Sequence, residues 1–238
     1  MAIGPERKVM SRAQAEAAAV DVGLRTYMLR VYNYMCVALA LSGAVAFYVS
    51  TSPTLQQAIF GTPLMWVVFL APLGLVFFLS ARIHKMSATA AQTTFWIFAG
   101  LMGMSLASIF IAYTPESVTR VFFITAGAFA GLSLVGYTTK RDLSGMRTFL
   151  FMGVIGLVIA MVVNMFLASS GLQLLISVAG VLIFAGLTAY DTQRIKLMYY
   201  EADSAEVATK KSIMGALKLY LDFLNMFMFM MHIMGNRN

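Results

Sequence analysis

Cysteine and charged residues are both scarce in this chain of 238 residues. Cys36 is the only cysteine and lies in an apolar run, which excludes a disulfide framework and a cysteine-based metal site. Only 11% of the residues are charged, whereas 60% are hydrophobic and the mean hydropathy is +0.81. Soluble globular domains do not have this composition, so the sequence predicts a polytopic membrane protein.

Several catalytic and transport signatures are absent as well. The sequence contains no Glu-x-x-His or His-x-x-x-His pair and no Gly-Lys-Ser/Thr phosphate loop. These absences argue against a metal hydrolase and a nucleotide-driven pump. No internal repeat is visible, which argues against an inverted-repeat transporter. We therefore expect a protein that is not an enzyme and has no cofactor.

Seven apolar segments are long enough to cross a bilayer, for which a helix needs about 20 residues. They are residues 27–49, 63–81, 89–113, 118–137, 146–167, 172–190 and 212–234, and the sixth is expected to continue as an amphipathic helix to Tyr200. Short connections predict that the third segment pairs with the fourth, and the fifth with the sixth. Gly127 and Gly131 form a Gly-x-x-x-Gly motif, for which we expect helix packing. The sequence thus predicts an all-α, seven-helix transmembrane domain over residues 27–238.

Residues 1–26 form a polar, alanine-rich tail ahead of the first segment. A signal peptide has a brief basic start, a short apolar core and a small-residue cleavage site. This tail is too long to be the brief basic start of a signal peptide, and no cleavage site follows the first apolar run. We expect an uncleaved cytoplasmic tail that is partly disordered or helical at the surface.

Lysine and arginine are distributed unevenly between the two sides of the predicted bundle. Of the 17, 14 fall on the side of the N-terminus, while Arg120 and Arg237 fall on the other side and Lys218 lies inside the last segment. The positive-inside rule predicts a cytoplasmic N-terminus and a C-terminus outside. This distribution explains the net charge of +7 without a nucleic-acid partner, and opposite termini independently support seven spans.

The last segment carries an acidic residue near its middle. A carboxylate at the depth of Asp222 costs about 3 kcal/mol or more unless protein or water faces it. Lys218, Asp222 and Asn225 are spaced by four and three residues, so they share one face of a helix. A helix that is apolar nearly all round, with one polar stripe, is typical of the centre of a bundle. We expect the other six helices to surround it.

Two further ionisable residues lie at the ends of predicted segments. Asp191 ends the sixth segment, three residues before Arg194, and Arg82 ends the second. Considered alone, Asp191 is an interfacial acid that pairs with Arg194 or Lys196. Arg82, considered alone, is an ordinary basic anchor at the cytoplasmic side.

Four short motifs resemble those of the Bax-inhibitor (transmembrane Bax-inhibitor motif) family. Tyr-Asp-Thr-Gln at 190–193 and Ala-Leu-Lys-Leu-Tyr-Leu-Asp-Phe-Leu-Asn at 216–225 resemble its paired signatures. Residues 29–35 and 80–87 resemble its proteobacterial branch. The resemblance covers nearly all seven segments. It implies a seven-helix protein of a bacterial inner (plasma) membrane, with the last helix surrounded by the other six.

The resemblance also implies a function, a pH-sensitive calcium leak. Two aspartates near the cytoplasmic side are the sensor in the family and correspond here to Asp191 and Asp222, while Arg82 corresponds to an arginine that can pair with them. The implied partners are the lipid bilayer and calcium ions or protons, with the two aspartates as calcium contacts. Residues 63–81 contain no acidic residue, unlike some calcium-conducting members, and this difference argues against calcium conduction.

Physical chemistry supports a sensor made of two such aspartates. Two carboxylates in contact cannot both ionise cheaply, so Asp191 and Asp222 would share one proton and report pH as a change in local charge. Arg82 nearby would favour the doubly charged form. Lys218 either extends to the cytoplasm or neutralises Asp222. The two aspartates meet only if the sixth helix sits deep or a cytoplasmic cavity wets the site.

Two other classes of function stay open at this point. One is a regulator that binds and restrains a membrane-anchored quality-control protease, a role to which bacterial members of the family are linked. The other is an intramembrane enzyme that uses the aspartate pair. Intramembrane aspartyl proteases usually place a glycine beside the catalytic aspartate, and neither Asp191 nor Asp222 has one, so the enzyme is the weaker alternative.

Overall fold

The computed structural model describes residues 12–238, with side chains from Asp21 onward. This part of the chain forms eight α-helices and two short 3-10 helices: α1 (Arg12–Thr51), α2 (Pro53–Phe60), α3 (Leu64–Arg82), η1 (Ile83–Lys85), α4 (Ala88–Ala112), α5 (Pro115–Thr138), η2 (Ser144–Met146), α6 (Arg147–Leu167), α7 (Ser170–Leu197) and α8 (Ala205–Met234). Seven of the α-helices, all but α2, are long and apolar enough to cross a membrane. The predicted all-α, polytopic membrane fold is confirmed.

Serine and threonine side chains determine where many of these helices begin. In α2, α4, α5, α7 and α8 a backbone N–H of the first turn donates to the side chain before the helix, which is Ser52, Ser87, Thr114, Ser169 or Ser204. Each cap satisfies a donor that the helix itself leaves free. In α2 and α5 a proline follows the cap, where its missing N–H removes no helical hydrogen bond. The sequence did not predict α2, because its eight residues are too few to span a membrane.

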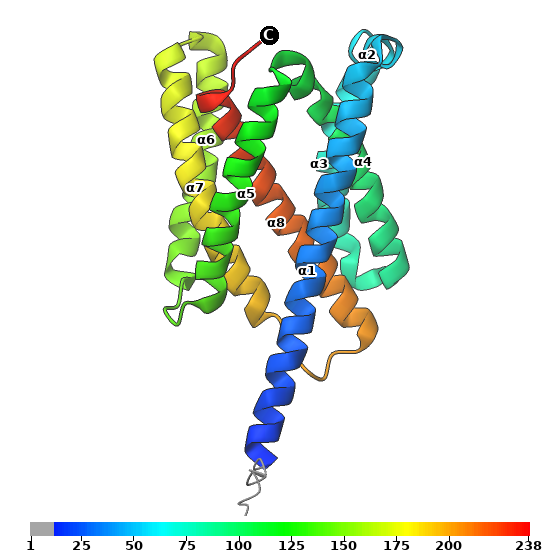
Figure 1. Cartoon of the computed structure of the whole chain (residues 1–238), viewed down its shortest axis with the longest axis vertical. Coiled ribbons are helices and arrows are strands. Elements are labelled where there is room, and N and C mark those ends of the chain that lie inside the picture. Colours follow the sequence, from blue (N-terminus) through cyan, green and yellow to red (C-terminus); the bar gives the residue numbers. More distant parts are fainter. Residues whose placement is uncertain (1–11) are drawn as a thin grey trace, which may run out of the picture.

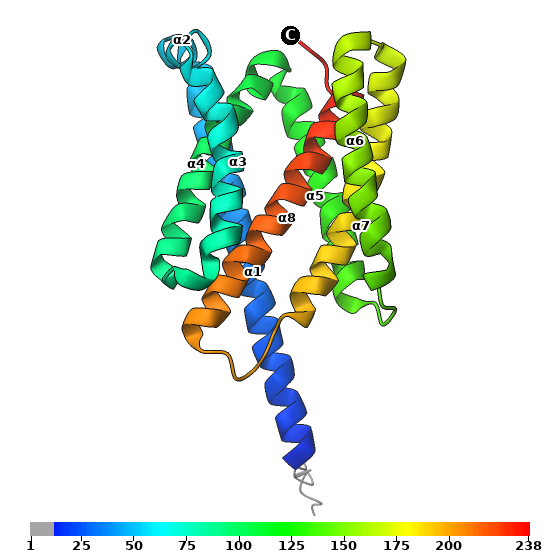
Figure 2. The ribbon, with the colours of Figure 1, turned by 180° about the vertical axis from the view of Figure 1, so that it is seen from behind.

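The last helix, α8, lies at the centre of the molecule. In its most apolar stretch 67% of the residues are buried, against 17–33% in the other six spans. It runs diagonally between a group formed by α1, α3 and α4 and a group formed by α5, α6 and α7 (Figures 1 and 2). It packs against α1, α4, α5 and α7. The prediction that the last helix is central is confirmed.

Aromatic rings and one buried hydroxyl fix the middle of α8. Phe223 packs edge-to-face on Phe122 and Phe129 of α5, with ring centroids 5.5 and 5.6 Å apart. Aromatic pairs prefer this geometry. On the opposite side of α8, the hydroxyl of Tyr220 lies 2.6 Å from Ser42 Oγ of α1. Ser42 also lies 2.7 Å from the backbone oxygen of Ala99, so one hydroxyl connects α1, α4 and α8.

Two expectations about helix packing need correction. The helices α6 and α7 are antiparallel neighbours as expected, whereas α4 and α5 diverge from their short connection and hardly touch (Figure 1), because both pack on α8 instead. Gly127 and Gly131 face open space, since a methyl group added to either would meet no atom within 4 Å. A close backbone contact occurs instead at Gly136, where an added methyl would overlap the backbone oxygen of Ala189 in α7.

The start of α1 at Arg12 and the C-terminus lie at opposite ends of the molecule (Figure 1). Residues 1–11 of the predicted tail lie outside the described residues, and residues 12–26 are helical and continue into the first span. The end where α1 begins also carries the α3–α4, α5–α6 and α7–α8 connections. We call it the basic end after the basic residues in these connections and in the adjoining helix turns, Arg82, Lys85, Lys140, Arg141, Lys210 and Lys211.

Candidate functional site

The helices α7 and α8 bring Asp191 and Asp222 close to each other. Their side chains are close enough to hydrogen-bond to each other. Asp191 exposes 9% of its surface and Asp222 exposes 5%. A hydrogen bond between them would need one proton on the pair, because an ionised carboxylate can only accept hydrogen bonds. The geometry therefore suits two acids that hold a single proton between them.

The diagonal course of α8 explains how the two aspartates reach the same depth. Asp222 lies three turns beyond Lys211, which in an upright helix would put it well above Asp191. The tilt of α8 (Figure 2) shortens that rise. Near the pair, Gly215 lets α8 approach α7, because an added methyl there would lie 3.0 Å from Ile195 Cγ2.

Lys218 is the cation that belongs to the pair. Its Nζ lies 3.5 Å from Asp191 Oδ1, and its side chain is 47% exposed. Lys218 therefore contacts a buried aspartate and also has an exposed side chain. The sequence had offered two alternatives for this lysine, extension to the cytoplasm or neutralisation of Asp222. Asp191 thus has a charged partner, whereas Oδ2 of Asp222 is buried without a hydrogen-bond partner in the described chain.

Arg82 and Asn225 do not join the pair. Arg82 is exposed at the end of α3, and within residues 21–238 no ion pair connects it to Asp191 or Asp222. The side chain of Asn225 donates to the backbone oxygen of Leu221, one turn earlier in α8, at 2.8 Å. The positive charge beside the aspartates comes from Lys218 and not from Arg82. The sequence spacing had suggested that Lys218 would neutralise Asp222, but its ion pair is with Asp191.

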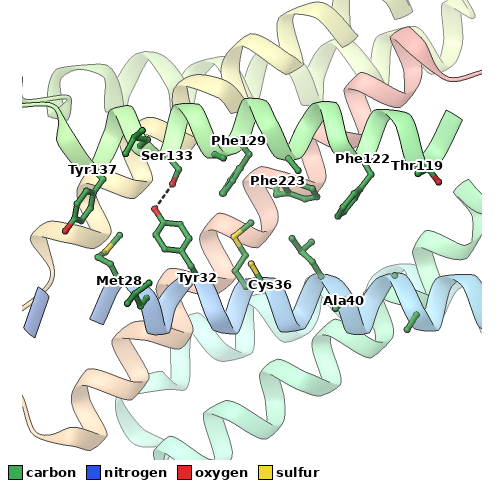
Figure 3. Close-up of a pocket in the computed structure, with 18 of the residues that line it drawn as sticks. Met28, Tyr32, Cys36, Ala40, Thr119, Phe122, Phe129, Ser133, Tyr137 and Phe223 are labelled. Carbon is green, nitrogen blue, oxygen red and sulfur yellow. Dashed lines mark hydrogen bonds between the residues drawn. The ribbon is translucent and has the colours of Figure 1, made fainter. Parts of the chain in front are cut away.

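A chain of hydroxyl groups starts beside Asp191, and the sequence analysis did not find it. Thr192 Oγ1 in α7 lies 2.9 Å from Ser133 Oγ in α5. Ser133 Oγ lies 2.6 Å from the hydroxyl of Tyr32 in α1 (Figure 3). Three helices are thereby linked through the residue next to Asp191. Single hydroxyl residues are too common in apolar helices to be recognised from sequence alone.

The end of α7 is fastened to the α5–α6 connection. Lys196 Nζ donates to the backbone oxygen of Tyr137 at 2.8 Å, so this lysine is not a partner of Asp191. Gln193 accepts from Leu143 N–H at 2.9 Å and also donates to the backbone oxygen of Arg141 at 2.8 Å. These bonds hold the last turns of α7 at the basic end, and with them Asp191, against the neighbouring helices.

The α5–α6 connection contains an aspartate of a different kind. The backbone N–H of Ser144 donates to Asp142 Oδ1 at 2.8 Å. This hydrogen bond holds the pKa of Asp142 below its usual value, so its carboxyl stays ionised near neutral pH. Asp142 is exposed and lies outside the spans, which makes it a suitable control for the buried pair.

The two carboxylates alone could not form a complete calcium cage. Calcium takes six to eight oxygen ligands, and two carboxylates offer at most four. In the described part of the chain no cluster of three or more His, Cys, Asp or Glu residues is placed to hold a metal ion. Calcium at Asp191 and Asp222 would keep water or backbone oxygens as its other ligands.

Comparison with known proteins gives consistent matches over nearly the whole chain. The family described as "Inhibitor of apoptosis-promoting Bax1" matches residues 24–238. RP147 of Rickettsia prowazekii is 46% identical over 217 residues, which cover 91% of this chain and 92% of that protein. "Inner membrane protein YbhL" of Escherichia coli K12 is 45% identical over 218 residues, which cover 90% of this chain and 93% of YbhL. A protein of Borreliella burgdorferi is 40% identical over 213 residues, covering 89% of this chain and 92% of that protein.

Proposed function

This chain belongs to the Bax-inhibitor family, and from the buried acid pair we propose that it is a pH-sensitive calcium leak channel of the bacterial inner membrane. The observation that carries the proposal is the contact between Asp191 and Asp222 inside the membrane-spanning region. Asp191 pairs with the base Lys218, and a second acid, Asp222, lies beside that pair. A second acid next to an ion pair is an arrangement that can work as a proton switch.

Loss of the shared proton would change how α7 packs on α8. With the proton in place the two carboxyls attract each other through a hydrogen bond. Without it, two negative charges repel in a poorly solvated place, and the single cation Lys218, which contacts Asp191 directly, faces both of them. Two packings that differ by a few kcal/mol can be switched by such a charge change. We propose that this switch opens or closes the path past Asp222.

Lys218 marks the aqueous side of that path. It is half exposed although its Nζ contacts Asp191, and we propose that water reaches the pair at this side chain. Calcium approaching from that side would meet Asp191 first and the bare Oδ2 of Asp222 next. Lys218 would have to swing away to let the cation pass, which its flexible stem permits.

Calcium flux into proteoliposomes tests this proposal. The parent protein should conduct calcium with a rate that changes with pH as the acid pair gains or loses its shared proton. Asp142→Asn is the control, because Asp142 is exposed and outside the spans, and it should keep the parental profile. Flux no greater than that of protein-free liposomes at every pH would overturn the channel.

A second function is favoured by one feature of the fold. The described part of α1 extends well beyond the other helices at the basic end (Figures 1 and 2). A projecting helix offers a surface to a partner, so the alternative is a regulator that binds and restrains a membrane-anchored protease. Deleting residues 1–19 should then abolish any effect on protease turnover while calcium flux stays intact. If the deletion removes flux, the tail belongs to the channel.

We propose no catalytic role for the pair. Neither aspartate has a neighbouring glycine in the sequence, which intramembrane aspartyl proteases usually place beside the catalytic acid. The ion pair from Lys218 to Asp191 also occupies one oxygen that a catalytic water would need.

A further inference from the structure

A lateral groove of about 1050 Å³ lies between α1 and α5, on the face of the molecule turned to the viewer in Figure 1. Side chains from both helices point into it (Figure 3). Its lining runs along α1 from Arg25 to Ala44 and along α5 from Val118 to Tyr137. At 1.5 Å per residue these rows are roughly 28 Å long, which is close to the 30 Å hydrocarbon thickness of a bilayer. We call this the α1–α5 groove.

The groove is closed on its inner side and open to the membrane on its outer side. Phe110 of α4 and Phe223 of α8 form part of its floor. In the described chain no helix crosses its outer side (Figure 1). Leu29 and Leu134 of its lining are 52% and 62% exposed. In a chain that spans a bilayer, the surface at such a position faces lipid chains.

Arg25 is a charged residue of the lining and stands at the basic end of the groove. It is exposed, and within residues 21–238 no carboxylate is paired with it. An unpaired guanidinium beside an apolar groove matches the two halves of an anionic phospholipid. The phosphate forms strong charge-assisted hydrogen bonds to arginine, and the acyl chain fills apolar space.

We propose that the α1–α5 groove binds one anionic phospholipid, with its phosphate at Arg25 and an acyl chain along the groove. An empty apolar groove of this size loses contacts along its whole lining, and a flexible chain of methylenes restores them. A helix of a second copy, about 10 Å wide, is too thick, because the Tyr32–Ser133 hydrogen bond of 2.6 Å bridges α1 and α5. An acyl chain is thin enough to lie beside that bridge.

The proposed lipid would touch the hydroxyl chain described above. Tyr32 lines the groove and is bonded to Ser133, which is bonded to Thr192. Thr192 follows Asp191 directly. Lipid binding in the α1–α5 groove does not depend on ion conduction.

Bound dioleoylphosphatidylglycerol, counted by native mass spectrometry of the full chain in detergent, tests the site. The parent should retain about one molecule per chain. Ala130→Trp fills the groove and should weaken binding at least about tenfold. Ala128→Trp is the matched control, because Ala128 is exposed on the same helix but does not line the groove, and it should bind as the parent does. Equal lipid retention by the two tryptophan variants would overturn the proposal and indicate adventitious lipid only.

The headgroup contact has its own variant. Arg25→Gln should weaken binding of phosphatidylglycerol about fivefold, while binding of dioleoylphosphatidylcholine changes little. Equal losses for both lipids would contradict a phosphate at Arg25.

Cys36 provides a test that needs no substitution. It is the only cysteine of the chain, is exposed, and lines the groove. A benzophenone attached to Cys36 should crosslink on illumination to the acyl chain of phosphatidylglycerol. Crosslinks confined to α5 of the same chain would show a closed groove, and crosslinks between chains would show a second copy in it; either result overturns the lipid site.

Discussion

At the scale of single residues, the identity of the cation beside Asp191 decides how the site responds to pH. Lys218 lies 3.5 Å from Asp191, on the helix that carries Asp222. Arg82, on α3, is exposed and has no such contact in the described chain. A nearby positive charge favours the ionised form of a carboxylate. The pH at which the proposed switch responds is therefore set in part by Lys218 of α8.

Lys218→Met should shift the pH transition of calcium flux to higher pH, because the variant lacks the cation that contacts Asp191. The sign follows from the lost cation, since the pair then keeps its shared proton to higher pH. Arg82→Met is the matched control and should leave the transition in place. A shift in the Arg82 variant with none in the Lys218 variant would restore the arginine to the site.

Sequence reasoning found the acids better than their surroundings. Asp222 stands out because a carboxylate within an apolar run is rare and costly, and Asp191 stands out through its motif. Arg82 was assigned to the pair by resemblance, although the end of α3 leaves it in solvent. The link from Tyr32 to Thr192 depends on which faces of three helices meet, and no local pattern encodes that.

At the scale of elements, the contact between α5 and α7 holds the part of α7 that carries Asp191 in place. Gly136 of α5 packs directly on the backbone of Ala189, two residues before Asp191. Ser133, one turn earlier, bonds to Thr192. A change in the distance between α5 and α7 would therefore move Asp191.

Gly136→Ala should lower the stability of the protein in detergent by about 1–3 kcal/mol, the usual cost of forcing a methyl into a packed contact. Thermal unfolding measures this loss. Gly131→Ala is the control on the same helix, because an added methyl there meets no atom within 4 Å, and it should be neutral. Equal losses in both variants would indicate a general effect of alanine in α5 and not a close contact with α7.

The helices themselves were predictable from apolar length, and their arrangement was not. Each of the seven spans was located because about 20 apolar residues leave few other structures possible. The prediction that α4 and α5 pack against each other was wrong, because a short connection places the adjoining helix ends close together but does not fix the angle between the helices. Gly127 and Gly131 misled for a similar reason, because spacing identifies a small-residue face without showing what it meets.

At the scale of the whole molecule, the charge distribution predicts the orientation of the protein in the membrane. The basic end carries the N-terminal start of α1 and three connections rich in lysine and arginine, and the C-terminus lies at the other end (Figure 1). The positive-inside rule places the basic end in the cytoplasm. The solvent route to Lys218 and the acid pair would then open to the cytoplasm.

Reporter fusions test this orientation. Reporters placed after Lys140 and after Lys210 should be cytoplasmic, and a reporter after Asn238 should lie on the opposite side. Both basic connections belong to one end of the bundle, so they act as each other's control. A cytoplasmic C-terminus would contradict the seven-span topology.

The central claim is that Asp191 and Asp222 act as one pair. The most direct measurement is calcium flux against pH in proteoliposomes for Asp191→Asn, Asp222→Asn and the double variant. Each single change removes the shared proton, so each should abolish most of the pH dependence, and the double change should add little because interacting sites are not additive. If both single variants keep the parental pH profile, or if their effects simply add in the double variant, the two aspartates do not form a switch.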